Sequence, residues 1–379
     1  MSEWREARLG EVCSRLRSGT NITAKDIHEV GEVPVFGGNG IRGYASEPNF
    51  SGECAIIGRQ GAYCGNVRYF NGAARMSEHA VVAVADAGNN TRFLAYLLST
   101  MNLGRLSGQA AQPGLSVKIL AQEPVLMPPL DLQARVASFV GSIDDLIENN
   151  RRRIEVLEEA LQAIYREWFV KFRFPGHEHA PMVDSALGPI PEGWRAATIG
   201  DALELKYGKA LKASARRGGG VAVVSSAGVV GWHDESFVDG PAIVVGRKGN
   251  VGSVHWVDGP CWPIDTAYFV QTDLPLSFVS EQLRRTAFTN SHAAVPGLSR
   301  EAAYAQPFLL PDVQVLDSFQ ALVDPLGSHA TGLMSQNEKL AEVRDLLLPK
   351  LVTGQIDVSS LDLDAVISTG STEESAVAQ

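Results

Sequence analysis

Two stretches of the chain have the hydrophobic spacing of long helices. In the first, apolar residues recur at alternating intervals of three and four between 147 and 168, and Asp131, after a Pro-Pro pair, is the expected N-cap. The second stretch, 333–351, repeats the spacing with weaker occupancy, and Gly327 and Gly332 leave its start undefined. The predicted seams consist of Ile147, Asn150, Ile154, Leu157, Leu161, Ile164 and Trp168 in the first helix, and of Leu333, Asn337, Leu340, Arg344, Leu347 and Leu351 in the second.

Shorter apolar runs, punctuated by Gly, Asn and Asp, predict the strands of twisted sheets. These runs are 33–36, 54–57, 80–84, 221–224, 242–245 and 267–270. One short helix is expected after the first three runs, at 91–100, and another after the last three, at 277–288. Each group of runs is therefore predicted to form an α+β module.

The sequence repeats itself with a period of about 185 residues, which is typical of a duplicated domain rather than of a solenoid. The segments that return in order are 4–10 as 194–200, 57–61 as 245–249, 113–116 as 296–299, and 121–128 as 305–311. Segments 20–55 and 209–242 scarcely align, although the sequence around them does. Variable loops on a repeated scaffold indicate recognition of a ligand.

Chain order predicts how modules and helices are arranged. The first helix leaves module one and reaches module two, and the second helix leaves module two, so packing of their seams makes them antiparallel. The predicted fold class is α+β, with two pseudo-two-fold-related modules of twisted β-sheet and short helices, separated by an antiparallel two-helix coiled coil. From 143 to 168 the first helix would span roughly 38 Å, close to the separation of about 34–36 Å between DNA half-sites one turn apart.

The seam of each predicted helix contains one asparagine, Asn150 in the first and Asn337 in the second. A polar residue in a coiled-coil core can fix the register of the helices at some cost in stability. Coiled coils also tolerate stray polar residues. The sequence favours neither interpretation.

The domain boundaries follow from these patterns. The predicted domains are 1–130 and 194–312 for the two modules, 131–172 for a central spacer helix, 173–193 for a Pro/Gly-rich linker, 313–356 for a distal helical region, and 357–379 for a disordered acidic tail. The net charge is −10, but residues 311–379 contain 3 basic and 11 acidic residues, which accounts for eight of the ten excess negative charges. The modules are nearly neutral, so the overall acidity does not exclude DNA as a ligand.

Composition and cysteine spacing narrow the class of protein. A chain with 45% hydrophobic and 20% charged residues is typical of soluble globular proteins. No apolar run of about 18 residues occurs, and residues 1–10 carry charges where a signal peptide is apolar, so the chain is expected to be cytoplasmic. Cys13, Cys54, Cys64 and Cys261 have neither disulfide nor zinc-ligand spacing, and we expect free thiols and no metal.

Three segments carry a resemblance to a known family. They are Trp-Phe-Val-Lys-Phe-Arg-Phe-Pro-Gly-His-Glu at 168–178, Leu-Gly-Pro-Ile-Pro-Glu-Gly-Trp at 187–194, and Leu-Pro-Lys-Leu-Val-Thr-Gly-Gln-Ile at 348–356. These segments resemble the central junction and distal region of the specificity subunits of type I restriction-modification systems. The resemblance extends from residue 1 to about residue 358 and includes the duplicated plan. The acidic end and the thinly occupied second helix depart from the family pattern.

The resemblance implies a function and a set of partners. Each module would be a target recognition domain that reads one half of a split double-stranded DNA sequence, and the helices would dock two modification methyltransferase subunits. The chain itself would be non-catalytic and hold no cofactor. Its partners would bind S-adenosylmethionine and methylate adenine N6, and restriction motor-nuclease subunits using ATP and Mg are further expected partners in defence against foreign DNA.

Candidate DNA-binding residues are Lys and Arg for phosphates, and Arg, Lys, Asn and Gln for base edges in the major groove. In module one they are Arg15, Arg17, Lys25, Arg59, Gln60, Gln109, Gln112 and Lys118. In module two they are Lys206, Lys209, Lys212, Arg216, Arg217, Arg247, Lys248, Asn250 and Arg300. The five cations from Lys206 to Arg217 are the densest group and are interpreted as a mobile basic loop for a phosphate backbone, the plainer alternative being a solvated surface loop.

Two short motifs recur in both modules. Gly-Arg-Gln-Gly at 58–61 and Gly-Arg-Lys-Gly at 246–249 predict tight turns with the cation presented at the tip, and its repetition favours DNA contact over an incidental arginine. Pro-Gly-Leu-Ser at 113–116 and 296–299 suits a type II turn and is interpreted as scaffold. Ser116 and Ser299 are weak candidates for a helix cap or phosphate contact. Tyr63, Tyr207 and Trp232 are expected to pack, and His177 and His179 are not assigned to a metal.

Two rival functions were weighed against DNA recognition. An enzyme would need chemistry that the motifs do not supply: there is no methyltransferase Asp/Asn-Pro-Pro-Tyr motif, no phosphate-binding Gly-x-x-x-x-Gly-Lys-Ser/Thr loop and no Gly-x-Ser-x-Gly. The other rival is a non-catalytic coiled-coil scaffold whose duplicated β-rich modules bind protein or glycan. The divergent, cation-bearing loops on matched frames favour DNA.

Overall fold

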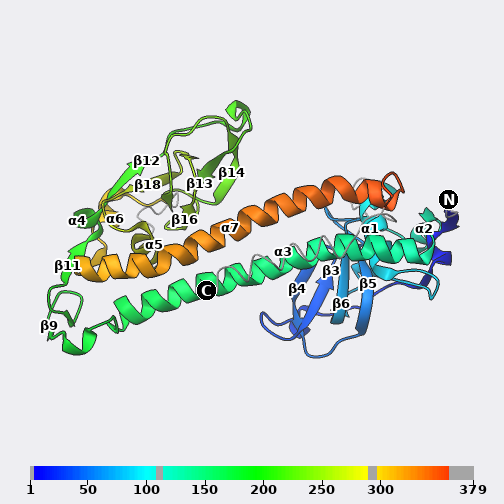
Figure 1. Cartoon of the computed structure of the whole chain (residues 1–379), viewed down its shortest axis with the longest axis horizontal. Helices are drawn as coiled ribbons and strands as arrows, with labels where there is room; N and C mark the ends of the chain where they lie inside the picture. The colour runs from blue at the N-terminus through cyan, green and yellow to red at the C-terminus, as the bar shows by residue number, and fades with distance from the viewer. Residues whose placement is uncertain (1–3, 108–113, 289–296, 358–379) are drawn as a thin grey trace. The chain divides into compact units, whose positions relative to one another are not determined.

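The computed structural model describes residues 4–107, 114–288 and 297–357 of the 379-residue chain. The chain divides into two compact units: unit 1 comprises residues 1–149 and 336–379, and unit 2 comprises residues 150–335. Each unit contains one of the repeated modules. Each also contains a segment of both long helices, α3 (Leu130–Tyr165) and α7 (Val313–Val352), which Figure 1 draws in green and orange.

Unit 1 is built on a six-stranded sheet with the order β2-β7-β5-β6-β3-β4, and β1 pairs separately with β8. The bounds are β1 Arg5–Arg8, η1 Leu9–Glu11, β2 Cys13–Ser18, η2 Ala24–Asp26, β3 Val33–Gly37, β4 Gly40–Ala45, β5 Phe50–Gly58, β6 Val67–Met76, β7 Ala80–Ala85, α1 Thr91–Thr100, η3 Leu103–Leu106, α2 Val117–Ala121 and β8 Pro124–Met127. Helix α1 packs on β5, β6 and β7 and buries Phe93, Leu94 and Leu98 against them.

Unit 2 has a four-stranded sheet, β12-β18-β15-β16, a three-stranded sheet, β14-β13-β17, and the pairs β9-β10 and β11-β19. A π-helical turn, η4 Arg166–Val170, follows α3 directly. The other bounds are η5 His177–His179, β9 Met182–Val183, β10 Ile190–Pro191, β11 Arg195–Thr198, α4 Ile199–Ala202, β12 Glu204–Tyr207, η6 Ala213–Ala215, β13 Val221–Ser225, β14 Gly228–His233, β15 Ala242–Gly246, β16 Val254–Val257, β17 Cys261–Pro263, β18 Ala267–Gln271, α5 Leu276–Arg285, α6 Arg300–Tyr304 and β19 Pro307–Leu310.

The two modules have the same strand order when β16 and β17 together are taken as the counterpart of β6. The segments that scarcely align in sequence, 20–55 and 209–242, both form a 3-10 turn and then a β-hairpin, β3-β4 and β13-β14. In both modules the first strand of that hairpin pairs in parallel, β3 with β6 and β13 with β17. Because strand pairing uses the backbone, side chains facing solvent can diverge while the topology is kept.

In each module a glycine follows the first strand of the main sheet and packs tightly against the turn before the neighbouring strand. The amides of Gly19 and Gly208 donate to the carbonyls of Ala80 and Ala267, at 2.9 and 3.1 Å. A Cβ atom on Gly19 would lie 2.1 Å from the Met76 carbonyl oxygen, and one on Gly208 would lie 2.1 Å from that of Ile264. Only glycine permits this approach. Each sheet also buries a small apolar core of its own.

The strand and helix predictions are confirmed for the apolar runs, most of whose residues are buried. The six predicted runs lie within β3, β5, β7, β13, β15 and β18. The predicted helix 91–100 is α1, and 277–288 corresponds to α5, which ends at Arg285. The sequence did not single out β2, β4, β6, β14 and β16, whose residues are mostly half-buried or exposed, because their apolar signal is diluted by polar positions.

One prediction about a helix end is wrong, and one helix start that the sequence left undefined is given by the structure. Asp131 is not the N-cap of α3, since the helix begins at Leu130 and the Pro129 carbonyl accepts from the Gln133 amide at 3.0 Å; Asp131 lies inside the first turn. Helix α7 begins at Val313 and continues through Gly327 and Gly332 without a break. Its packing overrides the low helix propensity of glycine, because one face of its first half is buried.

In unit 1 the first part of α3 runs antiparallel to the last part of α7. Val136 and Val140 of α3 share a buried cluster with Leu351 and Val352 of α7. Further along α3 and further back along α7, the Asn337 side-chain Nδ2 donates to the Ile147 carbonyl at 3.3 Å. Rising numbers on α3 therefore meet falling numbers on α7.

In unit 2 the later part of α3 and the early part of α7 are antiparallel by the same test. Nη2 of Arg153 lies 3.3 Å from Nε2 of His329, and the rings of Tyr165 and Phe319 lie 6.2 Å apart. Phe169 in the π-helical turn packs on Phe319 with ring centroids 4.9 Å apart. The aromatic residues of the junction segment thus form the core that joins both helices to the module of this unit.

The predicted seam positions of both helices are all buried or half-buried. Asn150 is buried with 1% of its surface exposed, and Asn337 is half-buried. The bond from Asn337 to the Ile147 carbonyl crosses from α7 to α3. A bond of this kind depends on the axial alignment of the helices, so it supports the interpretation that Asn337 fixes their register.

Asp144 of α3 links three helices of unit 1 and provides a test of this packing. Its Oδ2 accepts from the Tyr96 hydroxyl of α1 at 2.6 Å, and its Oδ1 accepts from Nη1 of Arg344 of α7 at 2.9 Å. We predict that Asp144→Asn lowers the free energy of unfolding by about 1 to 2 kcal/mol, because it removes a charged acceptor from two donors. Urea unfolding of the full chain measures the loss. Glu342→Gln, at an exposed position of α7, is the control, and equal stability of both variants would contradict the proposed role of Asp144.

Candidate nucleic-acid interface

The two short motifs that recur in the sequence meet each other in both units. In unit 1 the Leu115 amide donates to the Arg59 carbonyl at 2.8 Å, and in unit 2 the Leu298 amide donates to the Arg247 carbonyl at 2.8 Å. We call Gly58–Gly65 and Gly246–Gly252 the arginine loops. Each is tied by this bond to the turn that contains the Gly-Leu-Ser sequence, so the motif interpreted as scaffold positions the motif interpreted as a DNA contact.

Each arginine loop is closed at its base by glycine backbone. The Gly65 amide donates to the Gly58 carbonyl, and the Gly252 amide donates to the Gly246 carbonyl, both at 2.8 Å. Within the loops, Gly61 and Gly249 both have φ of +81°, a conformation that other residues rarely adopt. The unit 2 loop is one residue shorter, yet its start follows the same path.

The arginine side chains bind their own chain. Nη1 of Arg59 donates to the Glu78 carbonyl at 3.4 Å, and Nη1 of Arg247 donates to the Asp265 carbonyl at 3.0 Å. These carbonyls are equivalent, since the residue after each accepts from the arginine amide, His79 from Arg59 and Thr266 from Arg247. Both arginines are half-buried. The expectation that the cation is presented at the tip is therefore wrong.

The side chain after the arginine is exposed in each loop, and Tyr63 of the unit 1 loop is 47% exposed as well. Gln60 and Lys248 are both exposed. Each also forms an isolated β-bridge with the neighbouring turn, Gln60 with Gly114 and Lys248 with Gly297. In such extended backbone successive side chains point in opposite directions, so an arginine directed inward turns its successor outward. Asn250, further along the unit 2 loop, is exposed as well.

The divergent hairpin of each module packs on the arginine loop. In unit 1 a Cβ atom on Gly38, in the β3-β4 turn, would lie 3.0 Å from the Gln60 carbonyl oxygen. In unit 2 the Ser253 hydroxyl, just after the loop, donates to the carbonyl of Ser226 in the β13-β14 turn at 2.6 Å. A constant loop and a variable hairpin thus form one surface in each unit.

Unit 2 adds an aromatic platform beside its loop. Tyr207 at the end of β12 is 46% exposed, and the guanidinium carbons of Arg247 and Arg300 lie 4.9 and 4.6 Å from its ring centroid. Lys209 lies over the Trp262 ring at 5.3 Å. Tyr207 therefore packs, as expected, but on cations at the surface. Ser18 occupies the corresponding position of β2 in unit 1, so the platform has no equivalent tyrosine there.

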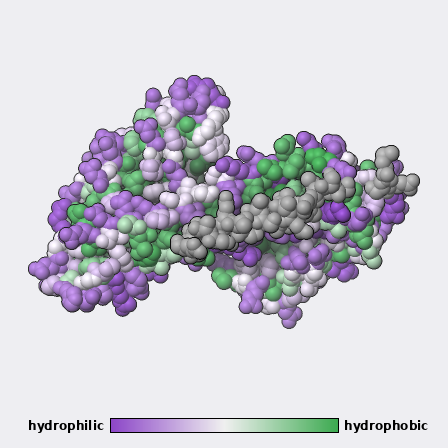
Figure 2. Space-filling model, in the orientation of Figure 1, coloured by the Kyte–Doolittle hydropathy of each residue, from purple (hydrophilic) through white to green (hydrophobic). Residues whose placement is uncertain are grey.

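The cations from Lys206 to Arg217 do not form one cluster. Lys206 pairs with Glu204, and Arg217 pairs with both Asp234 and Glu235. Arg216 donates to the Val230 carbonyl at 2.6 Å and is half-buried. Lys209 and Lys212 are exposed, and Figure 2 shows a mostly hydrophilic surface at the end of unit 2 that carries β13 and β14. The predicted basic loop is thereby reduced to these two lysines.

The remaining candidates of unit 1 are distributed along the module. Arg15 is half-buried, with its guanidinium 5.0 Å from the Phe50 ring centroid, and burial lowers its pKa from the usual value. Arg17, Lys25 and Lys118 are exposed. Gln109 and Gln112 lie outside the described residues. Of the two serines, Ser299 caps α6 by accepting from the Ala302 amide at 3.1 Å, whereas Ser116 precedes α2 without a side-chain cap bond.

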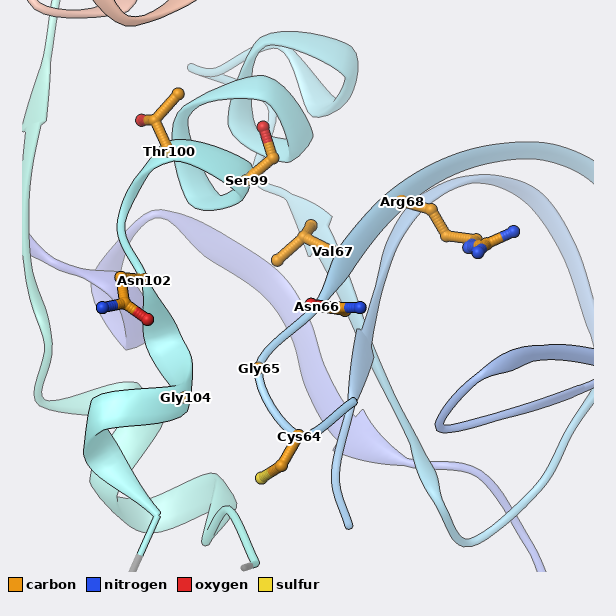
Figure 3. A pocket seen from close by; sticks show the side chains of 9 residues that line it. All are labelled: Cys64, Gly65, Asn66, Val67, Arg68, Ser99, Thr100, Asn102 and Gly104. Atoms are coloured by element: carbon orange, nitrogen blue, oxygen red, sulfur yellow. The ribbon is translucent and has the colours of Figure 1, made fainter. Parts of the chain in front are cut away.

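A shallow pocket of about 430 Å³ lies beside the arginine loop of unit 1 (Figure 3). It is lined by Cys64, Gly65, Asn66, Val67, Arg68, Ser99, Thr100, Asn102 and Gly104. The hydroxyls of Ser99 and Thr100 donate to helix carbonyls, and burial raises the pKa of the Cys64 thiol. These groups do not constitute an activated nucleophile.

Sequence reasoning missed Arg68. Figure 3 shows its side chain directed away from Ser99 and Thr100, and its Nη1 would lie 3.2 Å from a Cβ atom on Gly40. It thus reaches the hairpin turn that packs on the arginine loop. Its position on β6, two residues before the half-buried Phe70, was the available signal, but β6 itself was not predicted.

The described residues hold no group of three or more histidine, cysteine or acidic side chains placed to bind a metal. His177 contacts its own turn, with Nδ1 2.8 Å from the Phe174 carbonyl oxygen. Burial raises the pKa of Cys13 and Cys54 to about 12 and that of Cys261 to about 11, which keeps these thiols protonated. Among the described helices none is long and apolar enough to cross a membrane.

Comparison with known proteins agrees with this architecture. Residues 1–159 match the family model of the type I restriction modification DNA specificity domain. The type I restriction enzyme EcoprrI specificity subunit of Escherichia coli is 39% identical over 148 residues, covering 38% of this chain and 37% of that one. The MjaIX specificity subunit of Methanocaldococcus jannaschii is 24% identical over 311 residues, covering 72% and 70%.

A solved structure extends the similarity to the whole fold. The type I restriction-modification S subunit of M. genitalium superposes with a TM-score of 0.63 at 16% identity, over 92% of this chain and 96% of that one. The resemblance to type I specificity subunits is confirmed. The chain has the fold of this S subunit, and its residues 1–159 match the DNA specificity domain.

The closure of the unit 1 arginine loop can be tested at two glycines that differ in their surroundings. A Cβ atom on Gly65, where φ is +89°, would lie 2.1 Å from the Gly104 nitrogen, whereas one on Gly61 would meet nothing within 4 Å. We predict that Gly65→Ala lowers the free energy of unfolding by more than about 2 kcal/mol, and Gly61→Ala by about 1 kcal/mol from backbone strain alone. Chemical unfolding of the two variants checks the order, and the reverse order would refute the described closure.

Proposed function

We propose that this chain is the DNA sequence-recognition subunit of a type I restriction-modification complex. The observation that carries the proposal is the pair of arginine loops: their backbones are held by equivalent bonds, but their exposed side chains differ, Gln60 in one and Lys248 in the other. The divergent hairpins beside them differ as well. A repeated frame with different exposed groups suits a protein that reads two different half-sequences.

The contacts we propose fall into two classes. The exposed cations Arg17, Lys25, Lys118, Lys209 and Lys212 would neutralise phosphates and supply affinity without sequence preference. Gln60, Lys248 and Asn250 would reach base edges. Arg59 and Arg247 would not contact DNA themselves but would hold the loops in place.

The long helices support the proposal of a bipartite, gapped target. Helix α3 has 36 residues and α7 has 40, lengths of about 54 and 60 Å at the usual rise per residue. Each helix contributes to the core of both units. In the proposal they set the gap between the half-sequences and dock two modification methyltransferase subunits.

The proposed partners would carry the chemistry. The chain would be a non-catalytic cytoplasmic subunit, and the methyltransferase subunits would bind S-adenosylmethionine and methylate adenine N6. Restriction subunits using ATP and Mg would join the same complex. This division of labour rests on the resemblance to specificity subunits.

The proposal predicts a specific methylation pattern. A host that carries this gene and its cognate methyltransferase gene should methylate adenine within one gapped sequence, and deletion of this gene should abolish that methylation. Long-read mapping of modified adenines measures both. Finding no gapped motif that depends on this gene would overturn the proposal.

The phosphate contacts of unit 2 predict a salt effect. The double variant Lys209→Gln/Lys212→Gln should weaken DNA binding by the complex and reduce the slope of log affinity against log salt by about 2, since each lost phosphate contact lowers it by about 1. The methylated sequence should stay the same. Lys350→Gln, at the exposed end of α7, is the matched control. An unchanged slope in the double variant would exclude these lysines from the phosphate contacts.

A further inference from the structure

The side chains of Gln60 and Lys248 occupy equivalent places in the two units. Each follows an arginine whose backbone amide donates at 2.9 Å to the carbonyl of the residue just before a strand. These carbonyls belong to His79, before β7, and Thr266, before β18. Each precedes a glycine with φ of +81°. The two positions therefore share a backbone path and differ in side-chain chemistry.

The backbone at both positions is fixed from two sides. On one side the arginine carbonyl accepts from the neighbouring turn, and on the other the arginine amide donates across the sheet. The guanidinium adds a third tie, to the carbonyls of Glu78 and Asp265. With the backbone fixed in this way, only the side chain itself has to be ordered on binding, which favours discrimination between bases.

The chemistry of the two side chains matches different bases. A glutamine amide donates and accepts at once, which matches N6 and N7 of adenine in the major groove. A lysine ammonium only donates, which matches O6 and N7 of guanine. Both side chains are exposed, and each belongs to the surface formed by the arginine loop and the divergent hairpin of its own unit.

We propose that Gln60 and Lys248 are specificity-determining residues, reading adenine and guanine respectively at corresponding positions of the two half-sequences. Arg59 and Arg247 are positioning residues that hold them. This inference rests on the proposed function, because it assigns a base to each loop of a sequence-reading subunit.

The reciprocal substitutions test it in the assembled methyltransferase complex. Gln60→Lys should change one A·T pair to G·C in the half-sequence read by unit 1, and Lys248→Gln should change one G·C pair to A·T in the other half-sequence. In each case the preference for the original pair should fall by about 10- to 100-fold, and the remaining positions should not change. Adenine methylation mapped in hosts that express each variant reports the sequence directly.

The possible outcomes distinguish failure of the base assignment from failure of the proposed function. If both variants methylate the original sequence at the original rate, Gln60 and Lys248 do not read bases, although the chain still directs methylation. If Lys248→Gln slows methylation of every site equally, Lys248 contacts a phosphate and the base assignment is overturned. If the unchanged chain directs no gapped methylation, the proposed function itself fails.

Two further variants control for folding and for the positioning role. Asn71→Lys, which adds the same charge at an exposed site on β6 of unit 1, should leave the methylated sequence unchanged. Arg59→Lys should broaden the preference only at the base that Gln60 reads, because Arg59 holds that residue in place. A general loss of structure would instead lower methylation of every site and leave the preferred sequence unchanged. Should Gln60→Lys fail to assemble, Gln60→Ala is the substitute. It should lose preference at that same single base, and retained preference would contradict the proposal.

Discussion

The bond between an arginine carbonyl and the amide of a distant leucine determines how each module presents its surface. It joins Arg59 to Leu115 in unit 1 and Arg247 to Leu298 in unit 2, at the same length in both. Because the bond uses only backbone atoms, neither side chain next to it is constrained by the pairing itself. The arginine is free to bind the Glu78 or Asp265 carbonyl, and its successor is left at the surface. A duplicated gene can therefore change the exposed residue in one copy and leave the frame intact.

The sheets also keep their backbone pairing while their side chains differ, and the helices keep their packing in a similar way. The hairpins of segments 20–55 and 209–242 have unrelated sequences but equivalent pairing, since a strand ladder demands inward apolar residues and little else. The glycines at the ends of β2 and β12 are the exception, because a Cβ atom there would collide with a carbonyl. The helices require regular spacing of their apolar residues. Because α7 has a continuous buried face, it remains helical at Gly327 and Gly332.

The sequence was sufficient for features that depend on periodicity and repetition: the duplication, both long helices, the buried strands and α1. It was insufficient where tertiary contacts decide. Asp131 is a residue type that favours the N-cap position. However, the first helical hydrogen bond runs from the Gln133 amide to the Pro129 carbonyl, so the helix starts before Asp131. Arg59 and Arg247 were predicted to be displayed, but carbonyls from the next turn draw them inward. Arg217 was counted with a basic cluster, but two acidic residues just after β14, Asp234 and Glu235, pair with it. The partners of these arginines are distant in sequence and leave no local pattern.

The central proposal is that two equivalent loops present different side chains to DNA. An experimental structure of the complete methyltransferase complex on its methylated target tests it most directly. We predict that Gln60 and Lys248 lie at base edges in the major groove of the two half-sequences. The Arg59 and Arg247 guanidinium groups should still bind the Glu78 and Asp265 carbonyls. Arginine loops facing solvent or another subunit, with DNA on a different surface of each module, would contradict it.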